Sequence, residues 1–109
     1  KKVPVKITKC MVKCRKCISK CTKLCNSNKN KLKMKDCVKK CKCCINLCKT
    51  MIELCKCDPS GEMCKKMAKL CAMCCKKCMV ECNKHKDDKL CKQVILSCKT
   101  CHNACMKCC

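Results

Sequence analysis

Cysteine is the residue whose number and spacing in this chain could perform chemistry. There are 24 cysteines among 109 residues, and most recur at intervals of three or four. Side chains at i, i+3 and i+4 lie on one face of an α-helix, so this spacing predicts stripes of thiols that could cross-link helices or coordinate soft metals. Four stripes hold five cysteines each, namely Cys10, Cys14, Cys17, Cys21, Cys25; Cys37, Cys41, Cys44, Cys48, Cys55; Cys64, Cys71, Cys74, Cys78, Cys82; and Cys91, Cys98, Cys101, Cys105, Cys108. The remaining four are Cys43, Cys57, Cys75 and Cys109.

Disulfide bonding is one chemistry open to these cysteines, and their even number allows it. Side chains at i, i+3 or i, i+4 on a helix have Cβ atoms ~5–6 Å apart, whereas the Cβ atoms of a disulfide are ~3.8 Å apart. Disulfides within one helix would therefore be strained. Disulfides between helices remain open, so a secreted helical protein cross-linked by disulfides is an alternative interpretation.

Coordination of zinc or Cu(I) is the other chemistry. Zinc takes four thiolates at ~2.3 Å, so 24 thiols would make at most six closed sites of a metallothionein-like buffer. Cu(I) accepts two or three soft sulfurs, and a linear S–Cu–S unit spans ~4–5 Å, about two metal–sulfur bonds. That span suits i, i+4 pairs such as Cys10 and Cys14. Two unshared thiolates per ion would give about twelve Cu(I) ions per chain, and shared sulfurs roughly twenty. Binding of many Cu(I) ions by all 24 cysteines is therefore our leading hypothesis.

Polar segments separate the stripes and mark the ends of the helices that must position these thiols. We predict helices at residues 4–26, 31–56, 59–83 and 88–109, with Asp58 capping the third helix ahead of Pro59, and Asp87 or Asp88 capping the fourth. Short connections make successive helices antiparallel. The predicted fold is one all-α domain, residues 1–109, forming an up-down-up-down four-helix bundle with a cysteine-lined core.

Methionine and histidine extend the set of candidate ligands to the two ends of this bundle. Met51, Met63 and Met67 gather at one end, which we predict to be the opening through which copper enters, because thioethers are weak, exchangeable ligands for Cu(I). His85 falls at the opposite end and is a candidate end ligand. His102 is expected to face solvent. Neither histidine is placed with an acid and a nucleophile as catalysis would require, so no enzyme is predicted.

The overall composition excludes several classes of protein. Leu, Ile, Val and Phe total only 18 residues, and 29 basic residues against 7 acidic ones give a net charge of +22. A chain of this kind is disordered unless thiols replace the missing hydrocarbon core. No apolar run is long enough to span a membrane. With one arginine, Arg15, and no aromatic residue, specific recognition of nucleic acid is not expected.

The run Glu81-Cys82-Asn83-Lys84-His85, followed by Cys91, Cys98, Cys101 and Cys105, resembles the bacterial copper storage proteins. The CxxxC and CxxC ladder on four helices extends this resemblance over nearly the whole chain. The resemblance implies a four-helix bundle, usually a homotetramer, that holds Cu(I) inside through cysteines for storage or detoxification. Both cytosolic and exported members exist in that family.

Reduced thiols favour the cytoplasm for this chain. The missing initiating Met leaves open an exported, periplasmic form. Copper ions and further copies of the same chain are the expected partners.

Overall fold

The computed structural model describes residues 3–109, which form the four predicted helices and one short 3-10 turn. Their bounds are α1 Val5–Ser27, η1 Leu32–Met34, α2 Lys35–Cys57, α3 Glu62–Asn83 and α4 Lys89–Met106. No strand is present between residues 3 and 109. The predicted all-α bundle is confirmed.

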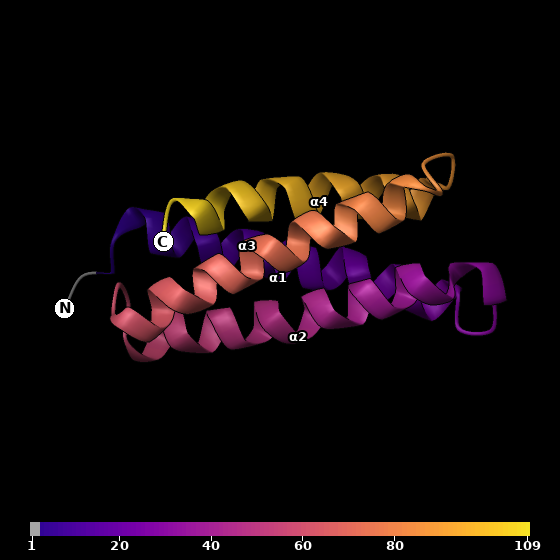
Figure 1. Cartoon of the computed structure of the whole chain (residues 1–109). Coiled ribbons are helices and arrows are strands. Elements are labelled where there is room, and N and C mark those ends of the chain that lie inside the picture. Colours follow the sequence, from indigo (N-terminus) through magenta and orange to yellow (C-terminus); the bar gives the residue numbers. More distant parts are fainter. Residues whose placement is uncertain (1–2) are drawn as a thin grey trace.

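The helices run up and down beside one another, as Figure 1 shows. Each helix packs against two others, in the pairs α1 with α2, α2 with α3, α3 with α4, and α1 with α4. The pairs α1 with α3 and α2 with α4 therefore face each other across the diagonals. The bundle measures 46 × 19 × 17 Å, so its interior is a narrow tube about as long as its helices.

The turn between α2 and α3 differs from the prediction. The third helix begins at Glu62 rather than at residue 59, and Gly61 takes the N-cap position that was predicted for Asp58. Ser60 adopts the left-handed conformation with φ of 64°, so the helix cannot extend back through it. The Gly61 amide donates to the Asp58 carbonyl at 3.0 Å, and a Cβ on Gly61 would overlap the Asp58 carboxylate. Asp58 therefore closes the turn and does not cap the helix.

The start of α4 follows the prediction. The Asp88 carboxylate accepts hydrogen bonds from the amides of Leu90 at 2.9 Å and Cys91 at 3.0 Å. These bonds satisfy amides that have no partner within the helix. Asp88 thereby fixes the register in which the first cysteine of α4 enters the bundle.

Thiols do fill the core in place of hydrocarbon. Of the 24 cysteines, 21 are buried, and those exposed are Cys43, Cys57 and Cys109. A buried thiol packs as a small, polarisable apolar group, so a sulfur-lined interior excludes water as a leucine core would. The fully buried hydrocarbon side chains Ile7, Leu24 and Val94 complete the inner surface.

Within residues 3–109, none of the helices combines the length and the apolar character needed to cross a lipid bilayer.

Candidate metal centre

Two helices, α1 and α4, form the first thiol ladder. Because they are antiparallel, each cysteine further along α1 meets one that is earlier on α4. The Sγ–Sγ separations are 3.5 Å for Cys10–Cys105, 3.7 Å for Cys14–Cys101 and 3.7 Å for Cys17–Cys98. The heptad spacing on both helices keeps these rungs in register over several helical turns.

The second thiol ladder joins α2 and α3 in the same way. Its rungs are Cys37–Cys82 at 2.9 Å, Cys41–Cys78 at 3.8 Å, Cys44–Cys74 at 3.5 Å, Cys48–Cys71 at 3.7 Å and Cys55–Cys64 at 3.8 Å. Met51, fully buried, lies between the last two rungs. Sulfur therefore lines this side of the tube over nearly its whole length.

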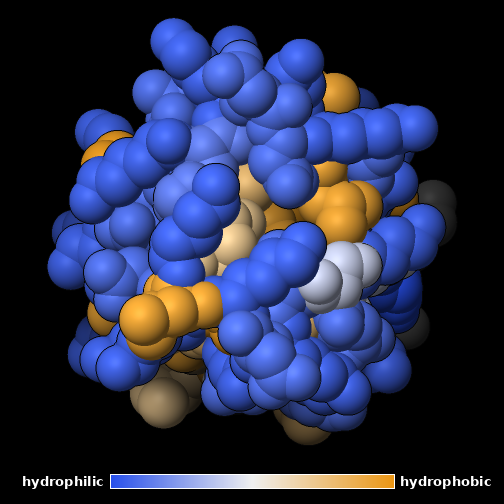
Figure 2. All heavy atoms as spheres, turned by 90° about the vertical axis from the view of Figure 1, so that its right-hand side faces the viewer, coloured by the Kyte–Doolittle hydropathy of each residue, from blue (hydrophilic) through white to orange (hydrophobic). Residues whose placement is uncertain are grey.

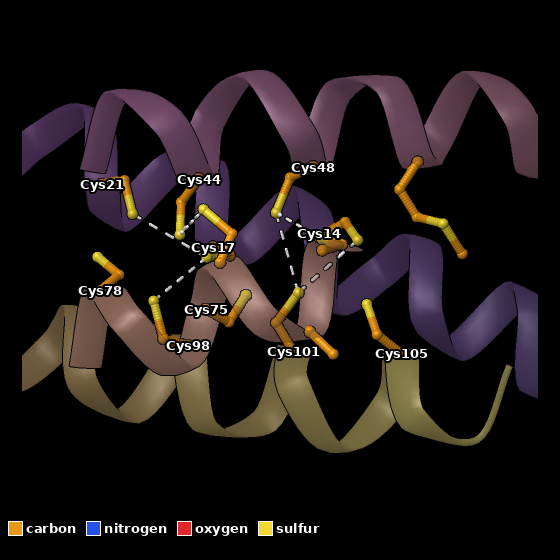
Figure 3. Close-up of a cluster of buried hydrophobic side chains, with 14 of the residues drawn as sticks. Cys14, Cys17, Cys21, Cys44, Cys48, Cys75, Cys78, Cys98, Cys101 and Cys105 are labelled. Carbon is orange, nitrogen blue, oxygen red and sulfur yellow. Dashed lines mark hydrogen bonds between the residues drawn. The ribbon is translucent and has the colours of Figure 1, made fainter. Parts of the chain in front are cut away.

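The two ladders meet on the bundle axis. Cys48 of the second ladder lies 3.9 Å from Cys101 of the first, and Figure 3 shows both side chains pointing into the space between the helices. Three overlapping groups of four thiols have all their sulfurs within 4.8 Å of one another: Cys14, Cys48, Cys71, Cys101; Cys17, Cys48, Cys75, Cys101; and Cys17, Cys44, Cys75, Cys98. Groups of three extend this arrangement toward both ends, namely Cys10, Cys14, Cys105 and Cys21, Cys78, Cys98. A continuous row of sulfur atoms, formed by these groups, thus runs along the interior; we call it the sulfur file.

These separations have the scale of metal–thiolate geometry. With metal–sulfur bonds of ~2.3 Å, two ligands lie ~4.6 Å apart in a linear unit and ~3.8 Å apart in a tetrahedron. All 24 cysteines are unbonded to one another, and the shortest rung, 2.9 Å, is well beyond the ~2.05 Å of a disulfide. The groups can therefore close around soft metal ions with small movements of side chains.

Contacts between helices, rather than along one helix, dominate this network. Cys17 and Cys21, whose Sγ atoms are 4.0 Å apart, are one such pair within a helix, but most of the short Sγ–Sγ contacts join two helices. The sequence prediction drew attention to such pairs within a helix. In the folded bundle the facing helix brings a sulfur closer, because antiparallel stripes interdigitate.

Hydrogen bonds among the thiols prepare some of them to ionise. The pKa of Cys10 is lowered to about 4, chiefly because the Cys105 and Cys14 thiols donate hydrogen bonds to its thiolate. The pKa of Cys105 is raised in turn, first by Cys10. At the ends of the tube, burial raises the pKa of Cys91 and of Cys108 to about 12. Metal ions would replace the protons that hold this network together.

Uncompensated positive charge surrounds the sulfur file. Within residues 3–109 the one ion pair joins Lys84 to Glu81 at 3.3 Å. The lysines on α1 that flank the stripe, such as Lys9 and Lys16, are exposed. A net charge of +22 on so narrow a bundle favours the loading of anionic metal–thiolate units.

The structure changes the predicted inner stripe of α3. The prediction placed Cys74 in the third stripe and left Cys75 outside it. Cys75 is fully buried and belongs to two of the groups of four thiols, whereas Cys74 and Met67, each 8% exposed, lie toward the flank. Ala68, one heptad before Cys75 on the same side of the helix, is fully buried. The helix rotates in this way because Ala68, Cys71, Cys75, Cys78 and Cys82 give the more regular heptad.

The other predicted ligands lie at or near the ends. Met51 is fully buried, Met67 is nearly so, and Met63 is 62% exposed; all three lie in the half of the bundle that ends at the α2–α3 turn. Cys57 and Cys109 are exposed near this end.

His85 lies at the opposite end, beside Met34, in a recess of about 320 Å³. Figure 2 shows this end of the bundle, where hydrophilic side chains surround a small central area in which hydrophobic side chains are visible. His102 does not simply face solvent as expected: it is half-buried, and its Nδ1 donates to the Ala72 carbonyl at 2.9 Å.

Comparison with known proteins identifies one family. A family model described as copper storage protein matches residues 1–109. Searches of curated proteins and of solved structures find no significant match.

Proposed function

Because the chain belongs to the copper storage protein family, we propose that it sequesters many Cu(I) ions per chain inside its bundle, as stored cargo. The observation that carries this proposal is the set of overlapping thiol groups on the bundle axis. Cu(I) is the cargo, and the cysteines of both thiol ladders are its ligands. Storage and detoxification use the same binding step and differ in whether the metal is later released.

The sharing of sulfurs supports Cu(I) over zinc. Four cysteines each belong to two of the groups of four, namely Cys17, Cys48, Cys75 and Cys101. A closed zinc site engages four thiolates around one ion, so adjacent zinc ions would compete for these four sulfurs. Cu(I) needs fewer ligands per ion, and one thiolate can bridge two ions. A continuous file of shared sulfur therefore suits closely spaced Cu(I).

Charge balance supports extensive loading. Each Cu(I) bound by two thiolates adds one negative charge, so about twelve such units would take the chain from +22 to about +10. Each thiol that binds releases its proton to solvent, which exposed lysines near the sulfur file favour. The metal thus neutralises part of the self-repulsion of the apo bundle.

We also propose assembly of several copies of the chain, a homotetramer in keeping with the resemblance noted above. The outer face of α3 supports this proposal, because Met63, Leu70, Met73 and Val80 are exposed there at heptad-like intervals. Such a stripe is typical of a helix that packs against another helix.

Two measurements test the proposed function against its alternatives. Thiol counting on protein purified without reductant should find nearly all 24 cysteines free, whereas a disulfide-linked protein would show few. Cu(I) added to the zinc-loaded protein should then displace all of the zinc and continue to bind. Retention of zinc in the presence of excess Cu(I) would favour the zinc buffer instead.

A further inference from the structure

Two pairs of consecutive cysteines face each other halfway along the second thiol ladder. They are Cys43-Cys44 on α2 and Cys74-Cys75 on α3. Consecutive residues on a helix lie about 100° apart, so each pair directs one sulfur toward the axis and the other toward the flank. Cys44 and Cys75 are fully buried, Cys74 is 8% exposed and Cys43 is exposed. We call Cys43 and Cys74 the flank thiols.

The flank thiols connect solvent with the centre of the sulfur file. Cys43 precedes Cys44 on α2, and Cys44 forms a rung with Cys74 of α3, so the exposed Cys43 lies at the outer side of that rung. An interaction with the Cys74 thiol raises the pKa of Cys43. Cys74 Sγ is 3.5 Å from Cys44 Sγ. Cys44 in turn lies within 4.8 Å of Cys17, Cys75 and Cys98. Each step between solvent and the axis therefore passes from one sulfur to an adjacent sulfur.

From this geometry we propose that Cys43 and Cys74 form a lateral uptake site, at which Cu(I) carried by a thiolate donor exchanges directly into the middle of the bundle. This inference rests on the proposed function and specifies its uptake step. The Cys43 thiol binds the incoming Cu(I) and passes its proton to one donor thiolate, which leaves as the free thiol. Cys74 displaces the second donor thiolate in the same way, and Cys44 then replaces Cys43, which takes up the proton that Cys44 gives up. Copper remains Cu(I) throughout.

This route needs thiols because the donor itself holds Cu(I) through thiolates. A thioether is a much weaker ligand than a thiolate for Cu(I), so the methionines at the α2–α3 end cannot draw copper from a thiolate complex. An exposed thiol can do so by stepwise exchange, provided that a second thiol is close enough to complete the transfer. Cys109 lacks such a neighbour among the described contacts, since its Sγ donates to the Cys105 carbonyl at 3.5 Å. Cys43 has Cys74.

The test compares rates of Cu(I) uptake from a Cu(I)–glutathione complex by reduced apo protein. Cys43→Ser should slow uptake at least about tenfold, because the thiol that holds copper in position for the next exchange is lost. Its final capacity should fall by no more than one ion. Asn46→Ser, one turn further along the exposed face of α2, is the matched control and should load at the original rate. Cys74→Ala should slow uptake as Cys43→Ser does, with circular dichroism confirming its helical content.

The outcomes separate this inference from the proposed function. Slow uptake by both flank-thiol variants from glutathione, with unchanged uptake from Cu(I) in acetonitrile, would support the lateral site. If Cys43→Ser loads as fast as the original chain, or if Cys57→Ser slows loading equally, the lateral site is wrong while storage of Cu(I) stands. If the original chain itself takes up no Cu(I), the proposed function fails.

Discussion

Cys48 of α2 and Cys101 of α4 approach to 3.9 Å across the diagonal of the bundle, although these two helices do not pack side by side. Each residue is also part of a rung on its own side, Cys48 with Cys71 at 3.7 Å and Cys101 with Cys14 at 3.7 Å. This contact joins the two thiol ladders into a single network. Metal ions bound in the central part of the tube would therefore share ligands from all four helices.

The capacity for Cu(I) should depend strongly on this junction. Cys48→Ala removes one sulfur from two groups of four, so we expect it to lower the capacity by about two ions per chain. Val94→Ala, which opens a comparable space at a fully buried position without a thiol, should cost stability but no capacity. The copper-to-protein ratio of each variant after gel filtration measures its capacity. An unchanged ratio for Cys48→Ala would contradict the shared network.

The methionines at the α2–α3 end should govern uptake of weakly held Cu(I). Replacing Met51, Met63 and Met67 with Leu preserves packing volume but removes the thioethers at this end of the bundle. We expect slower uptake from Cu(I) in acetonitrile, followed by stopped flow, with an unchanged final capacity. Met73→Leu, at an exposed position on the outer face of α3, is the control. Equal rates for the triple variant and this control would reject a role for the end methionines.

The N-cap of α4 should contribute measurably to the stability of the apo protein. Asp88→Ala removes the acceptor of two backbone hydrogen bonds and should lower the free energy of unfolding by about 1 kcal/mol. Asp88→Asn should retain most of that stability. Denaturant unfolding of the reduced protein measures both values. If the neighbouring substitution Asp87→Ala costs as much, the effect comes from charge rather than from the cap.

Alkaline pH should destabilise the apo bundle. Burial raises the pKa of Cys91 and Cys108 from 9.0 to about 12. The unfolded chain therefore loses these protons first. The stability that follows from keeping the two thiols neutral is fully present below pH 9 and is lost as pH rises toward 12. Denaturation midpoints of the reduced apo protein should fall across this interval.

Two comparisons test whether this loss of stability comes from the thiols of Cys91 and Cys108. Replacing Cys91 and Cys108 with Ala should reduce the fall in the midpoint, because no buried group then has to ionise there. The copper-loaded protein, whose thiolates are already ligated, should show a smaller fall than the apo protein. A fall of the same size in the apo protein, the variant and the loaded protein would assign the effect to other groups.

Periodicity was sufficient to predict the helices and the sulfur-lined core, because the cysteine stripes repeat at heptad spacing and the other apolar residues are too few to fill the interior. It could not choose between neighbouring residues. Cys74 and Cys75 both fit a helical stripe, and only the packing of α3 against two helices places Cys75 on the axis.

The remaining errors have local causes. The start of α3 was misplaced because Asp58-Pro59 is a common beginning for a helix, whereas the left-handed Ser60 and the turn closed by Gly61 delay it to Glu62. The hydrogen bond from His102 to Ala72 joins two helices far apart in sequence, and no pattern within one helix indicates it. Contacts between helices, including the diagonal one from Cys48 to Cys101, likewise become visible only in the folded bundle.

Titration of the reduced protein with Cu(I), in the presence of a competing chelator that reports unbound copper, tests the central claim most directly. A tube of shared thiolates should withhold copper from the chelator until more than six ions per chain are bound, with saturation from about twelve ions upward. Saturation at six ions or fewer, or immediate transfer of copper to the chelator, would contradict storage of Cu(I) by this bundle.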